Sequence, residues 1–283
     1  MKLKLSCSDF TFPLLSHDHA LDLISMLGFE GVDIGLFAAN AHLQPARVLK
    51  NPRASAKELS AKVYGRGLKF ADIFLTPGPD FQTLAANHPN AGVRRKSRDI
   101  FLRALEFVVR CKAKHLGALP GVHWPGESYG DSLQRCSAEL AWRGAESRRA
   151  GVEFSVEPHL GSIISTPKKT LRLIQMTPGL TLTLDYGHFT FQGFADREIE
   201  PLVAHASHFH ARGGARSRLQ TSVKNNRIDF KRVLHAMKRT GYRGYVCVEY
   251  VWIDWNHCNE ADNISETILM RDFLRKVKPT KNT

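Results

Sequence analysis

Residues 180–188 read LTLTLDYGH and predict a strand that ends in a carboxylate. The alternation of leucine and threonine is typical of a β-strand, in which successive side chains point to opposite faces. Thr181, Thr183 and Asp185 therefore share one face, and the leucines share the other. The stretch predicts a strand that is apolar on one side and polar on the other, with an acid as its last polar residue.

The same arrangement recurs in three further strands. GVEFSVEPH places Glu157 on the polar face, ASHFHA places His210 there, and GYVCVEY does so for Glu249. In ASHFHA the alternation puts His208 on the same face as His210 and leaves Ser207 on the opposite face. Each of these strands is therefore expected to end with an acidic or imidazole side chain.

Short apolar runs alternate with amphipathic segments along the whole chain at roughly 25 to 40 residue spacing, which is typical of repeated βα units and a parallel sheet. Helical patterns follow from Ser97 and from Asp131, and Gly151 is expected to end the second of them. The candidate strands are residues 3–7, 31–36, 68–75, 115–120, 153–157, 180–185, 206–210 and 244–249. Such a pattern predicts an α/β protein, a single (β/α)8 TIM barrel, whose typical size is about 250 residues.

No Pro- or Ser-rich linker divides the chain, so we expect one domain over residues 1–283, with the barrel in 1–275 and a basic tail in 276–283. The longest loop candidate is TPGPDFQTLAANHPNAGVRR from Thr76. A long loop on the catalytic side of a barrel can act as a lid, and the alternative is a passive insertion.

Composition narrows the class of protein. The five cysteines are odd in number and widely spaced, without a Cys-x-x-Cys pair, so neither a disulfide framework nor a zinc ribbon is indicated. The N-terminus lacks the apolar run of a signal peptide, and no long apolar stretch occurs, so we expect a cytoplasmic protein with no membrane partner. The net charge is +13, but the basic residues form short separate clusters, which argues against a nucleic-acid partner.

In a barrel the apolar faces pack beneath the helices and the polar faces point inward, so Glu157, Asp185, His210 and Glu249 converge at the C-terminal mouth. Carboxylates crowded together repel one another unless a cation lies among them. Asp185 is then most simply a metal ligand. Taken alone, each acid has a plainer alternative as a helix N-cap or a surface pair, and His208 is at least as well explained as a packed or outer-sphere histidine.

These residues resemble the xylose isomerase-like barrels, in particular the sugar isomerases and epimerases that include tagatose and psicose 3-epimerases. The matching pieces are GVEFSVEP, LDYGH, HFHAR, a following Arg216, and GYRGYVCVEY. The resemblance implies that Glu157, Asp185, His210 and Glu249 hold one divalent cation. It further implies that Glu157 and Glu249 act as catalytic acid and base, and that His188 and Arg216 contact substrate oxygens.

One departure from the ketose 3-epimerases stands out. Their second glutamate, about six residues after the first ligand, is replaced by Ile163 in EPHLGSI, and His159 is the candidate to serve instead. Just past the last strand, Trp252 is a candidate to bind substrate, with a subunit contact as the alternative. The substrate is then expected to differ from a plain free ketohexose.

A site with one imidazole and three carboxylates favours Mn²⁺, with Mg²⁺ or Co²⁺ as alternatives. Such a cation can stabilise the enediolate formed when a proton leaves the carbon next to a carbonyl. The expected function is therefore a metal-dependent sugar isomerase or epimerase with a small-molecule carbohydrate substrate. Barrels of this kind often assemble as dimers or tetramers, so a homo-oligomer is compatible with the resemblance.

Three alternatives remain open. An enediolate can also expel a β-substituent, which gives a lyase or dehydratase acting on an oxidised sugar, inositol or glycoside. An apurinic endonuclease of the endonuclease IV type shares the barrel and suits the basic charge, but its three-zinc site needs a late Asp-x-His pair that we do not find after His210. The last alternative is a non-enzymatic barrel that serves as a subunit.

Overall fold

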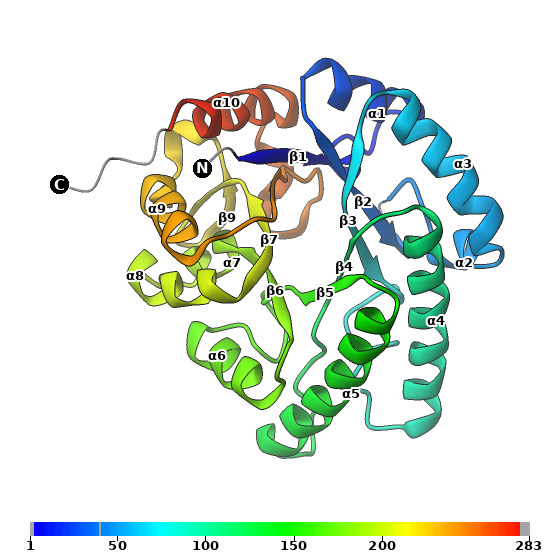
Figure 1. Cartoon of the computed structure of the whole chain (residues 1–283). Helices are drawn as coiled ribbons and strands as arrows, with labels where there is room; N and C mark the ends of the chain where they lie inside the picture. Colours follow the sequence, from blue (N-terminus) through cyan, green and yellow to red (C-terminus); the bar gives the residue numbers. More distant parts are fainter. Residues whose placement is uncertain (1–2, 40, 278–283) are drawn as a thin grey trace.

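Eight parallel strands close into a barrel in the computed structural model, which describes residues 3–39 and 41–277 (Figure 1). The order around the barrel is β1-β10-β7-β6-β5-β4-β3-β2. The strands are β1 (Lys4–Ser8), β2 (Gly31–Phe37), β3 (Lys69–Thr76), β4 (His115–Ala118), β5 (Glu153–Val156), β6 (Thr181–Asp185), β7 (Ala206–Ala211) and β10 (Tyr245–Val248). The prediction of a (β/α)8 barrel is confirmed, and the expected strand bounds differ from the observed ones by a few residues.

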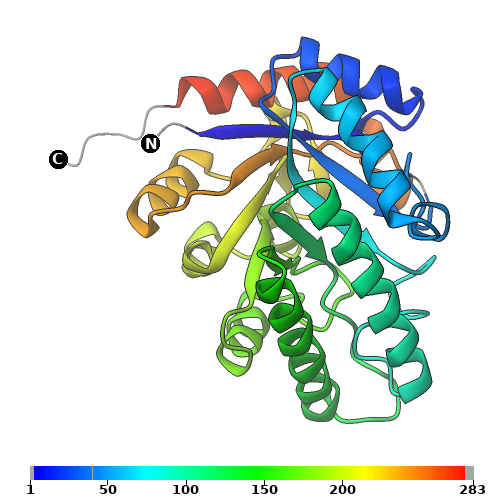
Figure 2. The ribbon, with the colours of Figure 1, turned by 45° about the vertical axis from the view of Figure 1, so that its right-hand side comes forward.

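Helices cover the outside of the barrel, and α3, α4 and α5 lie side by side along one flank (Figure 2). The α-helices are α1 (His17–Met26), α2 (Pro45–Val48), α3 (Pro52–Gly65), α4 (Ala91–Arg110), α5 (Tyr129–Arg149), α6 (Pro167–Met176), α7 (Tyr186–Phe191), α8 (Asp196–Ile199), α9 (Phe230–Thr240) and α10 (Asn263–Lys276). Short 3-10 helices are η1 (Asp9–Thr11), η2 (Glu200–His205), η3 (Val223–Asn225) and η4 (Trp255–Glu260). Among the described residues, no helix is long and apolar enough to cross a membrane.

Helix α4 begins earlier than the sequence suggested. Its first residue is Ala91, capped by the Asn90 side chain, which accepts a hydrogen bond from the backbone N–H of Gly92 at 2.7 Å. The pattern from Ser97 missed residues 91–96 because they are mostly charged and small. The loop after β3 is therefore shorter than expected and covers residues 77–90.

The strand faces follow the predicted alternation, with one exception. The leucines of β6 and the valines Val246 and Val248 of β10 are buried beneath the helices. Ser207, expected on this outer face, instead lies inside, where its Oγ is 2.7 Å from Thr181 Oγ1 and 2.8 Å from His115 Nε2. The prediction was wrong because the β6–β7 register shifts by one residue at this point, so that an extra residue of β7 turns inward.

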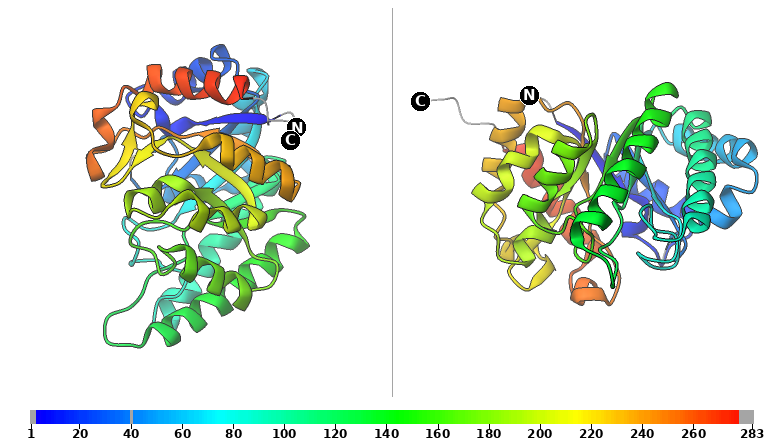
Figure 3. Two further views of the ribbon diagram at one scale, coloured as in Figure 1. Left: turned by 90° about the vertical axis from the view of Figure 1, so that its left-hand side faces the viewer. Right: turned by 90° about the horizontal axis from the view of Figure 1, so that it is seen from below.

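The C-terminal mouth carries a further small sheet that the sequence did not predict. Strands β8 (Gly213–Ala215) and β9 (Arg218–Thr221) form an antiparallel hairpin that lies beside η4 (Figure 3). Gln220 joins the hairpin to the segment after β10, since its Nε2 donates to Val251 O at 3.0 Å and its Oε1 accepts from Val251 N at 2.8 Å. Of the predicted basic tail, residues 278–283 lie outside the described residues.

Candidate active site

Glu157, Asp185, His210 and Glu249 come from four strands that are neighbours in the barrel, namely β5, β6, β7 and β10. Glu157 and Glu249 each lie one residue beyond their strand, but their backbone N–H groups still continue the ladder, to Ala118 O and Ala211 O, each at 3.1 Å. The ladder therefore fixes both glutamates at the mouth. All four side chains are buried.

His210 lies between the two glutamates. Its Nδ1 is 3.0 Å from Glu157 Oε1 and 3.3 Å from Glu249 Oε1, and its Nε2 faces Asp33 Oδ2 at 3.7 Å. Asp33 also accepts a hydrogen bond from His208 Nε2 at 2.5 Å, so His208 lies behind the site. We call Glu157, His210 and Glu249 the acid–imidazole cluster, because their ligand-type atoms all lie within 4.8 Å of one another.

Asp185 lies at the edge of this cluster and both its oxygens are engaged. Its Oδ1 accepts from the backbone N–H of Gly187 at 2.6 Å, which makes Asp185 the N-cap of α7. Its Oδ2 is 2.6 Å from Arg212, whose guanidinium also lies 3.9 Å from Glu249. The capping alternative named from the sequence is thus present, and Arg212 stands beside the carboxylate that the resemblance assigned to a cation.

Two further histidines border the cluster. The Nε2 of His188 lies 3.3 Å from the Arg212 guanidinium, 3.6 Å from Asp185 Oδ2 and 4.0 Å from Glu157 Oε1. Its ring contacts that of His159 at a centroid distance of 3.9 Å. Both residues line the same pocket as the cluster. The structure therefore brings His159 and His188 to the mouth together with the acids.

Burial and neighbouring charges shift the pKa values of two histidines of the site, His210 and His188. Burial opposes ionisation of His210, yet the charge of Glu249 and hydrogen bonds with Asp33 and Glu157 raise its pKa well above the ordinary value. Burial lowers the pKa of His188 well below its ordinary value, and the neighbouring cationic groups add to this effect. His188 is accordingly a neutral imidazole at pH 7, able to donate or accept a hydrogen bond.

The donor set fits a divalent cation. Two carboxylates and one imidazole gather within 4.8 Å of one another, and hard oxygen and nitrogen donors suit Mn²⁺, Mg²⁺ or Co²⁺. The negative charge that raises the pKa of His210 also attracts a metal ion, which would replace the proton on binding. Asp33, which faces the other ring nitrogen, occupies the place of the carboxylate that orients a metal-ligating histidine.

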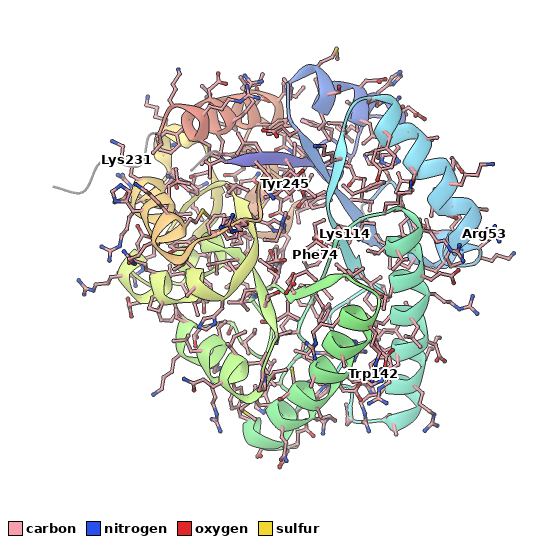
Figure 4. All side chains as sticks on the ribbon, in the orientation of Figure 1. Arg53, Phe74, Lys114, Trp142, Lys231 and Tyr245 are labelled. Atoms are coloured by element: carbon pink, nitrogen blue, oxygen red, sulfur yellow. The ribbon has the colours of Figure 1, made fainter. Side chains whose placement is uncertain are left out.

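A pocket of about 420 Å³ opens above the cluster. Trp252, predicted to bind substrate, lines it, and 41% of its surface is exposed. Phe74, labelled near the centre of the barrel in Figure 4, lines it from β3. Arg212 lines it as well, whereas Arg216 is exposed on the hairpin, where its guanidinium lies beside Gly193. Ile163 is buried away from this pocket.

The sequence missed several lining residues. Both Arg212 and Arg216 occur in the stretch HARGGAR. The β8–β9 hairpin leaves Arg212, and not Arg216, among the residues that line the pocket with the acids. Phe10, Phe37 and Phe81 could not be recognised as pocket residues from the sequence. An apolar residue near the end of a strand is most simply interpreted as part of the hydrophobic core.

Comparison with known proteins agrees with the barrel fold. A sequence profile described as "Xylose isomerase-like TIM barrel" matches residues 21–276. The chain belongs to the xylose isomerase-like TIM barrel family. Within curated proteins, an inosose dehydratase of Lacticaseibacillus casei is 23% identical over 266 residues, which cover 83% of this chain and 82% of that protein. The rhizopine catabolism protein MocC of Rhizobium meliloti is 30% identical over 153 residues, or 46% of this chain and 44% of that one.

Solved structures show the same fold. A D-psicose 3-epimerase from Clostridium cellulolyticum H10 has a TM-score of 0.76 at 16% identity, and the match covers 97% of this chain and 99% of that chain. At this identity the likeness concerns the fold alone. The named relatives and structural neighbours nonetheless include enzymes, an epimerase and a dehydratase among them.

Proposed function

We propose that this xylose isomerase-like barrel is a divalent-metal-dependent enzyme that removes a proton from the carbon next to a carbonyl group in a sugar or sugar derivative, acting as an isomerase or epimerase. The observation that carries the proposal is the placement of Glu157 and Glu249 at 3.0 and 3.3 Å from one imidazole nitrogen of His210. Two carboxylates that face the same point from different strands can serve as base and acid on one substrate.

The proposed ligands are Glu157, His210 and Glu249, with Asp185 as the fourth once its carboxylate parts from Arg212. A divalent cation held there, Mn²⁺ by preference, would polarise the carbonyl and stabilise the negative charge that develops on its oxygen. Arg212 and His188 line the pocket beside these ligands. The buried Nε of Arg212 has no hydrogen-bond partner among the described residues.

The way in which the two glutamates return the proton determines the reaction product. If one removes the proton and the other returns it from the opposite face, the carbon is epimerised. If the proton returns to the neighbouring carbon on the same face, the product is the aldose–ketose isomer. His188, neutral at pH 7, can hold a substrate hydroxyl in either case.

A dehydratase is the second candidate, and the similarity to an inosose dehydratase over 83% of the chain favours it. In that reaction the electrons of the broken C–H bond form a C=C bond, the C–O bond of the next carbon breaks, and the departing hydroxide takes a proton to become water. Ile163 stands where the ketose 3-epimerases have their second glutamate, and it is buried and does not line the pocket. This difference also supports loss of water, in place of epimerisation, after the proton has been removed.

The test is proton NMR in D₂O of keto sugars, keto-inositols and 3-keto-glycosides with Mn²⁺-loaded protein. We expect deuterium to enter the carbon next to the carbonyl, and the accompanying product to distinguish isomerase, epimerase and dehydratase. Glu249→Gln and Glu157→Gln should each slow the exchange at least ~100-fold, the usual contribution of a general base. Glu153→Gln, an exposed residue at the opposite end of β5, is the matched control and should keep the wild-type rate.

Loss of exchange after removal of the metal by a chelator, and its return with Mn²⁺, is also expected. Exchange that persists in both glutamine variants would contradict the proposed roles of the glutamates. Absence of exchange across the whole panel, with the metal shown to be bound, would count against proton abstraction as the reaction.

A further inference from the structure

The pocket above the acid–imidazole cluster has two ends of different chemistry. At one end lie the charged and imidazole side chains. Among the described lining residues outside this end, Thr76 alone carries a hydroxyl, amide or charged side chain. The polar residues of the first end are Glu157, His159, His188, His210, Arg212 and Glu249. The hydroxyl groups of a sugar can therefore be satisfied at the cluster but find few side-chain partners at the other end.

The apolar end has two aromatic walls. The first wall consists of Phe10 in η1, Phe37 at the end of β2 and Phe74 in β3. Its ring centroids are 4.9 Å apart between Phe10 and Phe37 and 6.0 Å apart between Phe37 and Phe74. Phe74 in turn lies 6.2 Å from the ring of His210, so the first wall begins directly at the cluster.

The second wall consists of Phe81, Trp252 and Trp255, and His159 joins it to the polar end. Phe81 meets the His159 ring edge-on at 5.0 Å, and Trp255 stacks on that ring at 5.1 Å with an interplanar angle of 13°. Trp252 and Trp255 each keep 41% of their surface exposed. This is apolar surface at a pocket that a bound group can still remove from water.

The size of the pocket exceeds the needs of one sugar ring. A six-carbon sugar displaces about six water molecules, or ~180 Å³ at the ~30 Å³ that each occupies in the liquid. The pocket measures about 420 Å³. Because both aromatic walls line this pocket, the space left by one sugar ring is open to a group joined to the sugar.

We propose that the substrate carries an apolar group, an aromatic ring or a short alkyl chain, joined to the carbonyl-bearing sugar and held between the two aromatic walls. This inference rests on the proposed function, because it assumes that the sugar carbonyl lies at the acid–imidazole cluster. Phe37 and Trp252, one from each wall, are then specificity-determining residues for the apolar group.

The test compares probes that share one head and differ in the attached group. Phenyl 3-keto-β-glucoside, methyl 3-keto-β-glucoside and the 3-keto form of a glucosyl-glucose disaccharide are titrated against the Mn²⁺-loaded protein by calorimetry. Burial of a phenyl ring is expected to tighten binding by ~10- to 100-fold relative to the methyl compound. Phe37→Ala and Trp252→Ala should each reduce this ratio several-fold, whereas Leu269→Ala, an exposed apolar residue on α10, should preserve it. Circular dichroism of each variant verifies the fold.

The outcomes separate this inference from the proposed function. Deuterium exchange with the methyl compound, without any preference for phenyl, would overturn the apolar subsite and leave the proposed function standing. A phenyl preference that depends on Phe37 and Trp252, with no exchange for any probe, would support the subsite and contradict the proposed function. Tighter binding of the disaccharide than of the phenyl compound would assign the walls to a second sugar ring and overturn the inference.

Discussion

Arg212 is the residue on which the charge balance of the site depends. Its guanidinium lies 2.6 Å from Asp185 and 3.9 Å from Glu249, and only 4% of its side chain is exposed. Burial raises the pKa of Asp185, and the charges of Glu249 and Glu157 add to this, while Arg212 and, to a smaller extent, His210 oppose protonation there. A buried carboxylate that loses such a partner is left without compensation.

We therefore expect Arg212→Met to lower the free energy of unfolding by about 3–5 kcal/mol, the usual cost of breaking a buried ion pair from one side. Arg216→Met is the matched control, since Arg216 is exposed on the β8–β9 hairpin that follows Arg212, and it should change stability by less than ~0.5 kcal/mol. Urea denaturation of both variants without added metal measures the difference. Equal stability of the two variants would show that Asp185 does not depend on Arg212.

Strand alternation explains how much of the site can be found in the sequence. It placed Glu157, Asp185, His210 and Glu249 on inward faces, and the structure brings them to one mouth, while their metal-binding and catalytic roles stay predictions. Alternation could not choose between Arg212 and Arg216, because the choice depends on a hairpin of three- and four-residue strands. Such short strands have too few residues to show a pattern.

At the scale of elements, local sequence patterns predict the regular parts of the fold and miss the irregular ones. The barrel follows from the repeat of βα units, which needs only local patterns that agree with one another. The inward turn of Ser207 was missed because a bulge adds one residue to a strand without any mark in the sequence. By contrast, the end of α5 at Gly151 was predicted correctly, because the left-handed residue that follows a helix is usually glycine.

Gly151 permits a direct test of that argument. It has φ +69°, and a Cβ built on it meets no described atom within 4 Å, so Gly151→Ala should lose about 1 kcal/mol through backbone strain alone. Gly65, the exposed last residue of α3, also has open space around it but has no positive φ. Gly65→Ala should therefore stabilise the protein by ~0.4–1 kcal/mol. Thermal unfolding of the two variants should shift in opposite directions, and shifts of the same sign would refute the role assigned to φ.

At the scale of the whole molecule, the closed barrel and its helices bury all five cysteines, Cys7, Cys111, Cys136, Cys247 and Cys258. Burial raises the pKa of Cys111 and of Cys136 to about 12, and it raises the pKa of the other three as well. The reactive thiolate is therefore scarce at pH 8.

We accordingly expect the native protein to resist a thiol reagent such as Ellman's reagent at pH 8, and to release five equivalents of product once it is unfolded in guanidinium. The time course of absorbance measures both. A cysteine of the native protein that reacted at the rate of a free thiol would reveal an opening of the barrel that this packing does not contain.

Metal binding should couple the acid–imidazole cluster to the stability of the whole barrel, because Glu157, His210 and Glu249 come from three different strands and meet only when the barrel is closed. A ligand that binds only the folded state stabilises it by about 2.7 kcal/mol at a concentration of 100 times its dissociation constant. We expect Mn²⁺ to raise the melting temperature of chelator-treated protein, with Mg²⁺ acting more weakly, and a chelator to reverse the shift. Glu157→Gln and Glu249→Gln should abolish the shift, while Glu153→Gln on the same β5 strand should keep it. A shift of equal size in all three variants would place the stabilising cation elsewhere on the molecule, and the proposed ligand set would then be wrong.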